Sequence, residues 1–193
     1  MLIAGGMLIV GGLLGGCAQE PARTGAPGED ARRALTERRS EGPIRAVVRG
    51  NPFGMDEVRL ENLVTRAMAQ GVSGLDVSFT TYPDQAAAPE PHLLVILNPA
   101  REPSAAAACG APETIGTAPA GEPLSVYAAF CQGDQPLDVA REEGTVAGPT
   151  DHGFERLLWR TSAALFPDDY ARNYGFGILP RWLGIGVGGS FGL

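Results

Sequence analysis

Apolar side chains recur with the period of an α-helix in two stretches of the chain. Over residues 56–70 the spacing i, i+3, i+4, i+7 and i+8 places five of them on one face: Leu60, Leu63, Val64, Ala67 and Met68. Asp56 and Glu57 lie in the first turn, where the helix dipole favours carboxylates, and Gly71 ends the pattern. The same period over 153–166 predicts a second helix, with Thr150 or Asp151 as its cap and Pro167 as its stop.

Other stretches have the composition or the period of β-strands. Residues 44–49 are rich in β-branched side chains, and residues 75–80 alternate apolar with polar positions. Residues 92–97 are almost wholly apolar, which predicts a central strand covered on both faces. Residues 124–130 predict a further strand, and 137–140 a short, weaker one after a turn at 132–134.

This order, β-α-β-β-β-(β)-α, predicts one α+β domain over residues 43–172. The economical packing is a mostly antiparallel sheet of four or five strands with two helices on one face. Residues 17–42 are polar and carry Pro, Gly and mixed charge, so we expect a flexible linker. Residues 173–193 form a glycine-rich, apolar C-terminal tail.

The tail alternates Leu183, Ile185 and Val187 with glycine, a period of two that suits a strand with one bare face. It is too short and too broken by glycine to span a bilayer as a helix. Two interpretations stay open. Either Trp182 and the tail contact a membrane or a partner protein, or the tail folds back on the domain or has no fixed structure; the second is the expectation.

Residues 1–16 are apolar and carry no ionisable side chain, a length that suits the apolar core of an export signal. The following segment, Leu14-Gly15-Gly16-Cys17, resembles the lipobox of bacterial lipoprotein precursors. This resemblance implies that signal peptidase II cuts before Cys17, that its thiol receives a diacylglycerol, and that its new amino group is acylated, commonly with palmitate. Ala18 after the cysteine, rather than Asp, implies the outer membrane, with the domain facing the periplasm.

The net charge argues against nucleic-acid binding, and the number of cysteines predicts a disulfide. A net charge of −7 lacks the basic footprint of a nucleic-acid binder. After lipidation of Cys17, Cys109 and Cys131 remain, and an exported protein lies where disulfides form. We therefore predict a Cys109–Cys131 bridge that joins a long loop to the sheet and adds about 3 kcal/mol of stability.

No cofactor or metal motif is predicted. The two histidines, His92 and His152, have no metal-ligand spacing, and the glycines of 184–189 open no helix and follow no βαβ unit. We therefore predict no catalytic, cofactor-binding or metal-binding residue.

Three functional hypotheses follow. The first is a non-enzymatic envelope module, tethered through Cys17, that docks on another envelope protein. The second is a periplasmic binder of a small ligand or of cell-wall material, with a pocket lined by aromatic residues such as Phe79, Tyr82 or Tyr127. The third is a periplasmic hydrolase, for which Cys131 as nucleophile, His152 as base and Asp151 form the least implausible set.

Overall fold

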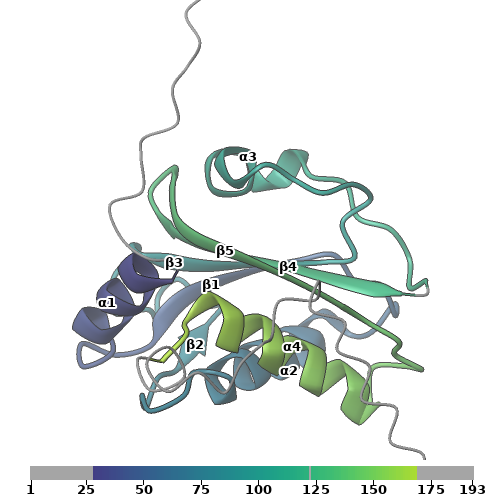
Figure 1. Ribbon diagram of the computed structural model, residues 1–193, viewed down its shortest axis with the longest axis horizontal. Helices are drawn as coiled ribbons and strands as arrows, with labels where there is room; N and C mark the ends of the chain where they lie inside the picture. Colours follow the sequence, from purple (N-terminus) through teal and green to yellow (C-terminus); the bar gives the residue numbers. More distant parts are fainter. Residues whose placement is uncertain (1–27, 122, 169–193) are drawn as a thin grey trace, which may run out of the picture.

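A five-stranded sheet forms the centre of the molecule in a computed structural model, which describes residues 28–121 and 123–168 (Figure 1). The strands follow the spatial order β2-β1-β3-β4-β5. The elements along the chain are α1 (Glu29–Arg38), β1 (Ile44–Arg49), α2 (Glu57–Gln70), β2 (Phe79–Thr80), β3 (His92–Leu97), α3 (Ala105–Gly110), the 3₁₀ turn Pro112–Thr114, β4 (Leu124–Gln132), β5 (Gln135–Gly144) and α4 (His152–Leu165).

The sheet is mixed. β1 runs parallel to both of its neighbours, β2 and β3, whereas β3–β4 and β4–β5 are antiparallel. The helix α2 provides the crossover that a parallel β1–β2 pair requires, and the tight turn at Gly133, with φ of +59°, joins β4 to β5. The α+β class is thus as predicted, but a mostly antiparallel sheet was too simple an expectation.

Helices cover both faces of the sheet rather than one. The larger core lies between the sheet and α1, α2 and α4, and includes the fully buried Val64, Leu93 and Phe130. The smaller core lies on the opposite face, under α3, and includes Leu94, Ile96 and Tyr127 (Figure 1). All six residues of β3 are buried, as predicted for a central strand.

The two predicted helices are present, and each begins one residue away from its predicted start, at Glu57 and at His152. Asp56 caps α2 by accepting a hydrogen bond from the Arg59 amide at 3.0 Å, and Asp151 caps α4 through the Gly153 amide at 2.8 Å. Beyond Leu165 the chain leaves the helix at Phe166, and Phe166 is fully buried against Phe79 and Phe130.

The predicted linker 17–42 needs correction because α1 belongs to the domain. Ala31 and Leu35 are fully buried, and their i, i+4 spacing puts both on the face that contacts the larger core. The Arg32 guanidinium fastens the helix by donating to the Phe166 carbonyl at 3.0 Å and to the Ser73 carbonyl at 2.8 Å. The folded domain therefore includes the described residues 28–42 and does not begin at residue 43.

Strand lengths also differ from the expectation. Of the predicted strand 75–80, Phe79 and Thr80 form β2 beside β1, whereas the predicted short strand at 137–140 extends to ten residues in β5. The loop after β3 contains α3, a run of alanines capped by Ser104, whose hydroxyl accepts from the Ala107 amide at 3.2 Å. Alanine has the highest helix propensity. A run of alanines shows no alternation of apolar and polar positions, however, so the hydrophobic pattern does not predict this helix.

Candidate functional site

Residues 99–121, between β3 and β4, lie across the face of the sheet that carries the smaller core (Figure 1). We call them the cover segment. Its Ala108, Cys109 and Ile115 pack on the side chains that β3 and β4 present to this face. Long connections that lack a full helix or strand are uncommon in compact domains and often carry function. The cover segment is therefore the first place to examine for a site.

A disulfide joins the cover segment to the sheet. Cys109 of α3 and Cys131 of β4 are bonded, with 5.7 Å between their Cα atoms, which is the pair predicted from the cysteine count. Both residues are buried, with exposed fractions of 5% and 0%. A buried, bonded sulfur is a structural link and supplies no thiolate.

Polar contacts from three side chains hold the rest of the cover segment. Arg49 of β1 donates to the Glu113 carbonyl at 3.2 Å, and Arg141 of β5 pairs with Glu102 at 2.6 Å. Asn98, at the end of β3, adopts φ of +50° and donates to the carbonyls of Ala118 and Pro119. These partners lie 20 or more residues apart in the sequence, so no local pattern indicated them.

The fold does not assemble Cys131, His152 and Asp151 into the active site of a hydrolase. Cys131 lies in β4, where its partner across the strand pair is His92 and not His152. His152 begins α4 with its side chain 93% exposed, and the Asp151 carboxylate caps that helix. Two amide hydrogen bonds, from Gly153 and Ala147, hold the pKa of Asp151 below its ordinary value. The role of Cys131 as a nucleophile is overturned by its disulfide.

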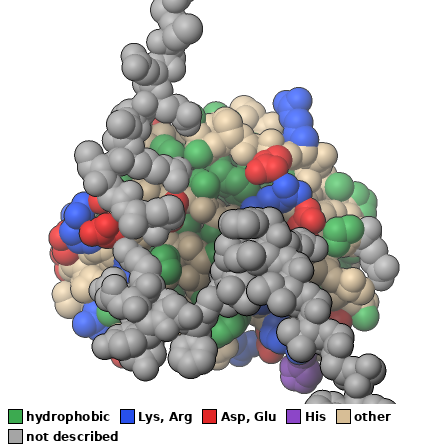
Figure 2. Space-filling view, viewed as in Figure 1, with side chains coloured by type: hydrophobic (Ala, Val, Ile, Leu, Met, Phe, Trp, Pro, Cys, Tyr) green, Lys and Arg blue, Asp and Glu red, His purple; other side chains and the backbone are tan. Residues whose placement is uncertain are grey.

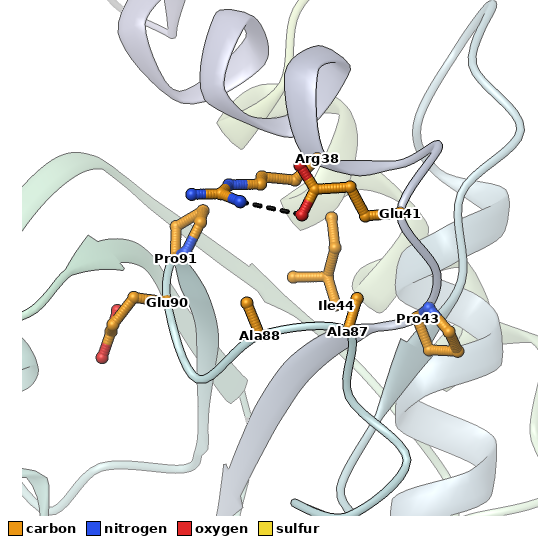
Figure 3. Close-up of a pocket in the computed structure, with 8 residues that line it drawn as sticks. All are labelled: Arg38, Glu41, Pro43, Ile44, Ala87, Ala88, Glu90 and Pro91. Atoms are coloured by element: carbon orange, nitrogen blue, oxygen red, sulfur yellow. Dashed lines mark hydrogen bonds and ion pairs between the residues drawn. The ribbon is translucent and has the colours of Figure 1, made fainter.

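His92 contacts a neighbouring carboxylate. Its Nδ1 lies 3.0 Å from Oε2 of Glu90, and the same oxygen accepts a hydrogen bond from the Gly133 amide at 3.0 Å. Figure 3 shows the Glu90 carboxylate turned away from the Arg38–Glu41 ion pair and from the small pocket beside it. That pocket measures ≈ 10 Å³, space for about one water molecule.

A larger hollow of ≈ 360 Å³ lies where β1 ends and α2 begins. Asn51 shapes its rim by donating to and accepting from the backbone of Met55, at 2.7 and 2.9 Å. The other walls are mainly apolar or acidic: Val48, Gly50, Glu57, Leu60 and Glu61. The hollow contains no aromatic side chain among these lining residues.

The three aromatic residues expected to line a ligand pocket do not gather. Phe79 belongs to the larger core, Tyr127 belongs to the smaller core on the opposite face, and Tyr82 is exposed in a loop. The prediction of a pocket lined by these three residues is therefore wrong, because the sheet separates Phe79 from Tyr127.

Several charged side chains on the described surface pair with one another. Arg141 contacts Glu143 as well as Glu102, and Arg160 of α4 pairs with Glu142. On the face shown in Figure 2, acidic and basic side chains of the described residues lie next to each other in small groups.

Several predicted features lie outside the described residues: the signal segment 1–16, Leu14, Gly15, Gly16 and Cys17 of the lipobox, and the tail 173–193 with Trp182. Over residues 28–121 and 123–168, no three His, Cys, Asp or Glu side chains cluster as metal ligands. In the same ranges no helix has both the length and the apolar character needed to cross a bilayer.

The chain was also compared with known proteins. No family model matches it, and neither a curated protein nor a solved structure shows significant similarity to it.

Proposed function

We propose that the protein is an envelope lipoprotein, held by lipid on Cys17 at the periplasmic face of the outer membrane, whose domain is a non-enzymatic docking or assembly module. The observation that supports this most directly is the buried Cys109–Cys131 disulfide. Structural disulfides form and persist in oxidising compartments such as the periplasm. An export signal that ends in a lipobox would deliver the chain to that compartment.

The short distance between anchor and domain favours a docking role. The helix α1 begins at Glu29, and 11 residues of the sequence separate it from Cys17. A fully extended chain of that length spans about 40 Å. Any partner in or near the same membrane would meet the domain at a high effective concentration, which strengthens a modest interface.

The described surface offers three large exposed hydrophobic side chains as contact points. Val58 at the start of α2, Tyr82 after β2 and Trp159 on α4 are 49%, 42% and 45% exposed. Trp159 is held in place because its Nε1 donates to the Gln70 carbonyl at 3.1 Å. Ordered aromatic residues of this kind are frequent centres of binding energy in protein interfaces.

The anchor is tested by growing cells with labelled palmitate and comparing the wild type with Cys17→Ser. We expect label on the wild-type chain and none on the variant. Absence of label, or label that survives the substitution, would overturn the anchoring.

Docking is tested by placing a photo-crosslinking amino acid at position 159, 82 or 58 in cells, with Ser73, which is exposed and polar, as the control position. We expect one reproducible crosslinked envelope protein from at least one apolar position and none from the control. No crosslink at any of the three positions, or equal crosslinks at Ser73, would contradict the docking role.

A further inference from the structure

The hollow of ≈ 360 Å³ between the end of β1 and the start of α2, which we call the β1–α2 hollow, lies at a distinctive point of the sheet. β1 and β3 are parallel neighbours, so their carboxyl ends lie side by side. After β1 the chain enters α2 over the larger core, whereas after β3 it enters the cover segment on the opposite face (Figure 1). In open sheets, ligands bind outside the carboxyl ends of parallel strands at such a point. The β1–α2 hollow therefore has the position of a ligand site.

The short β2 leaves part of β1 without a strand beside it. β2 pairs with Ile44 and Arg45, and among residues 28–121 and 123–168 no strand continues this pairing along 46–49. The Ile44 amide donates to the Ser78 carbonyl on the β2 side, and the alternation along a strand directs the amide and carbonyl of Val48 to that same side. Val48 lines the β1–α2 hollow. A strand edge of this kind offers its backbone donors and acceptors to a partner.

Two carboxylates of α2 line the β1–α2 hollow. Glu57 and Glu61 are four residues apart and so lie on one face of the helix. The Thr81 hydroxyl donates to Oε2 of Glu61 at 2.8 Å, which orients this carboxylate. The arginine ion pairs of the described residues involve other carboxylates, and no basic side chain is among those that line the hollow. Negative charge that is not neutralised locally attracts a cation.

The remaining side-chain surface of the β1–α2 hollow is mainly apolar. Leu60 is buried, and Val48 and Met55 are half-buried, so each presents part of an apolar side chain to the hollow. The start of α2 does not favour an anion, because the Asp56 carboxylate already accepts from the Arg59 amide. A volume of ≈ 360 Å³ lies at the lower end of the range of small-molecule sites, about 300–1,000 Å³.

We propose that the β1–α2 hollow binds a small organic amine in its protonated form. The ammonium group lies between Glu57 and Glu61, where its hydrogen bonds to carboxylate oxygens are charge-assisted. The apolar part of the ligand lies against Val48, Met55 and Leu60 and is removed from water there. The site is built from the described domain alone, so it depends neither on the proposed lipid anchor nor on the proposed docking role.

The test uses residues 17–193 with Cys17→Ser, the form that remains after the proposed cleavage, and hexylamine as the probe. NMR spectra of backbone amides measure the binding during a titration. We expect saturable shifts confined to residues 48–51 and 55–61. Hexan-1-ol and hexanoate share the apolar chain but not the positive charge, and we expect each to bind at least ten-fold more weakly than hexylamine.

The decisive variant is Glu57→Gln with Glu61→Gln, which removes both charges and keeps an oxygen that can accept from Thr81. We expect the dissociation constant of hexylamine to rise by about ten-fold or more, the usual effect of losing a hydrogen bond to a charged group. The matched control is Glu37→Gln with Glu113→Gln. It removes the same charge from two exposed side chains that do not line the hollow, and it should bind hexylamine as the wild type does.

A second variant, Val48→Phe, fills the β1–α2 hollow without a change of charge and should also weaken hexylamine binding. Three results would overturn the proposal: shifts that do not saturate or that map to other residues, equal affinity of the glutamine pair and the wild type, or equal affinity for hexan-1-ol and hexylamine. Unchanged binding by folded Val48→Phe would likewise place the amine outside the hollow. Because the assay contains neither lipid nor a partner protein, its outcome is separate from the palmitate and crosslinking tests.

Discussion

The hydroxyl of Ser162 on α4 donates a 2.6 Å hydrogen bond to the carbonyl oxygen of Met68 on α2, across 94 residues of sequence. Both helices approach closely here because Gly71 faces α4 without a side chain. A Cβ on Gly71 would lie 2.5 Å from the Trp159 carbonyl oxygen and 2.6 Å from the Ser162 Cβ. The φ of Gly71 is −75°, so this position requires glycine for space and not for backbone conformation.

The substitution Gly71→Ala should separate α2 from α4 and lower the free energy of unfolding by about 1–3 kcal/mol, the usual cost of overpacking. Urea unfolding followed by circular dichroism measures it. The control is Gly148→Ala, where a Cβ meets no atom within 4 Å. Its effect should stay within about 0.5 kcal/mol. Equal effects at the two positions would contradict the close helix contact.

Removal of the disulfide should destabilise the domain without abolishing its sheet. The bridge closes a loop with a sequence separation of 22, and Cys109→Ala with Cys131→Ala should cost about 3 kcal/mol in the chain-entropy model. Amides of the cover segment should also exchange faster with solvent. Reductant should weaken the wild type and leave the double variant unchanged, so a wild type indifferent to reductant would argue against the bridge.

Arg32 and Arg33 are neighbours with different roles, which makes them a matched pair. Arg32→Met keeps the apolar stem but removes the hydrogen bonds to Ser73 and Phe166, and we expect a loss of about 1–3 kcal/mol. Arg33 contacts Asp30 at the surface, and Arg33→Met should change stability by less than about 0.5 kcal/mol. Hydrogen exchange of α1 amides distinguishes the two. Similar protection in both variants would show that Arg32 does not fasten α1.

The Asp151 cap should make stability depend on acid pH. Its pKa in the folded protein lies below its ordinary value of 3.8, first because of the hydrogen bond from the Gly153 amide. A lowered folded pKa stabilises the fold fully above the unfolded pKa, and the contribution is lost as pH falls through the folded pKa. Asp151→Asn should therefore resemble the wild type more closely as the pH falls below about 4, approaching the folded pKa. A difference that is constant with pH would refute this.

Local patterns predicted the elements whose own side chains determine them. The spacing of Leu60, Val64 and Met68 predicts their shared helix face, because the backbone of every α-helix has 3.6 residues per turn. The strand His92–Leu97 is readable because a strand buried on both faces has no polar position to alternate. The pairing of Cys109 with Cys131 followed from the number of cysteines left after Cys17.

Other elements depend on what they contact. The helix α1 has one large apolar anchor, Leu35. It forms part of the domain because Leu35 packs in the larger core and Arg32 donates a hydrogen bond to the Phe166 carbonyl. The candidate sites show the same dependence. Phe79 and Tyr127 are both aromatic residues on strands, yet the sheet places them on opposite faces, which no spacing in the sequence reveals.

The sequence by itself determined the two long helices and the central strands, the cap of α4, the two cysteines available to pair and the resemblance of residues 14–17 to a lipobox. Each of these is set by residues that are neighbours along the chain. Tertiary structure alone decided that β1 runs parallel to β2 and β3, that α3 covers the second face, and that Gly28 meets Pro167. These outcomes depend on which apolar surfaces, distant in the sequence, are buried against each other, and the fold of the whole chain sets those contacts.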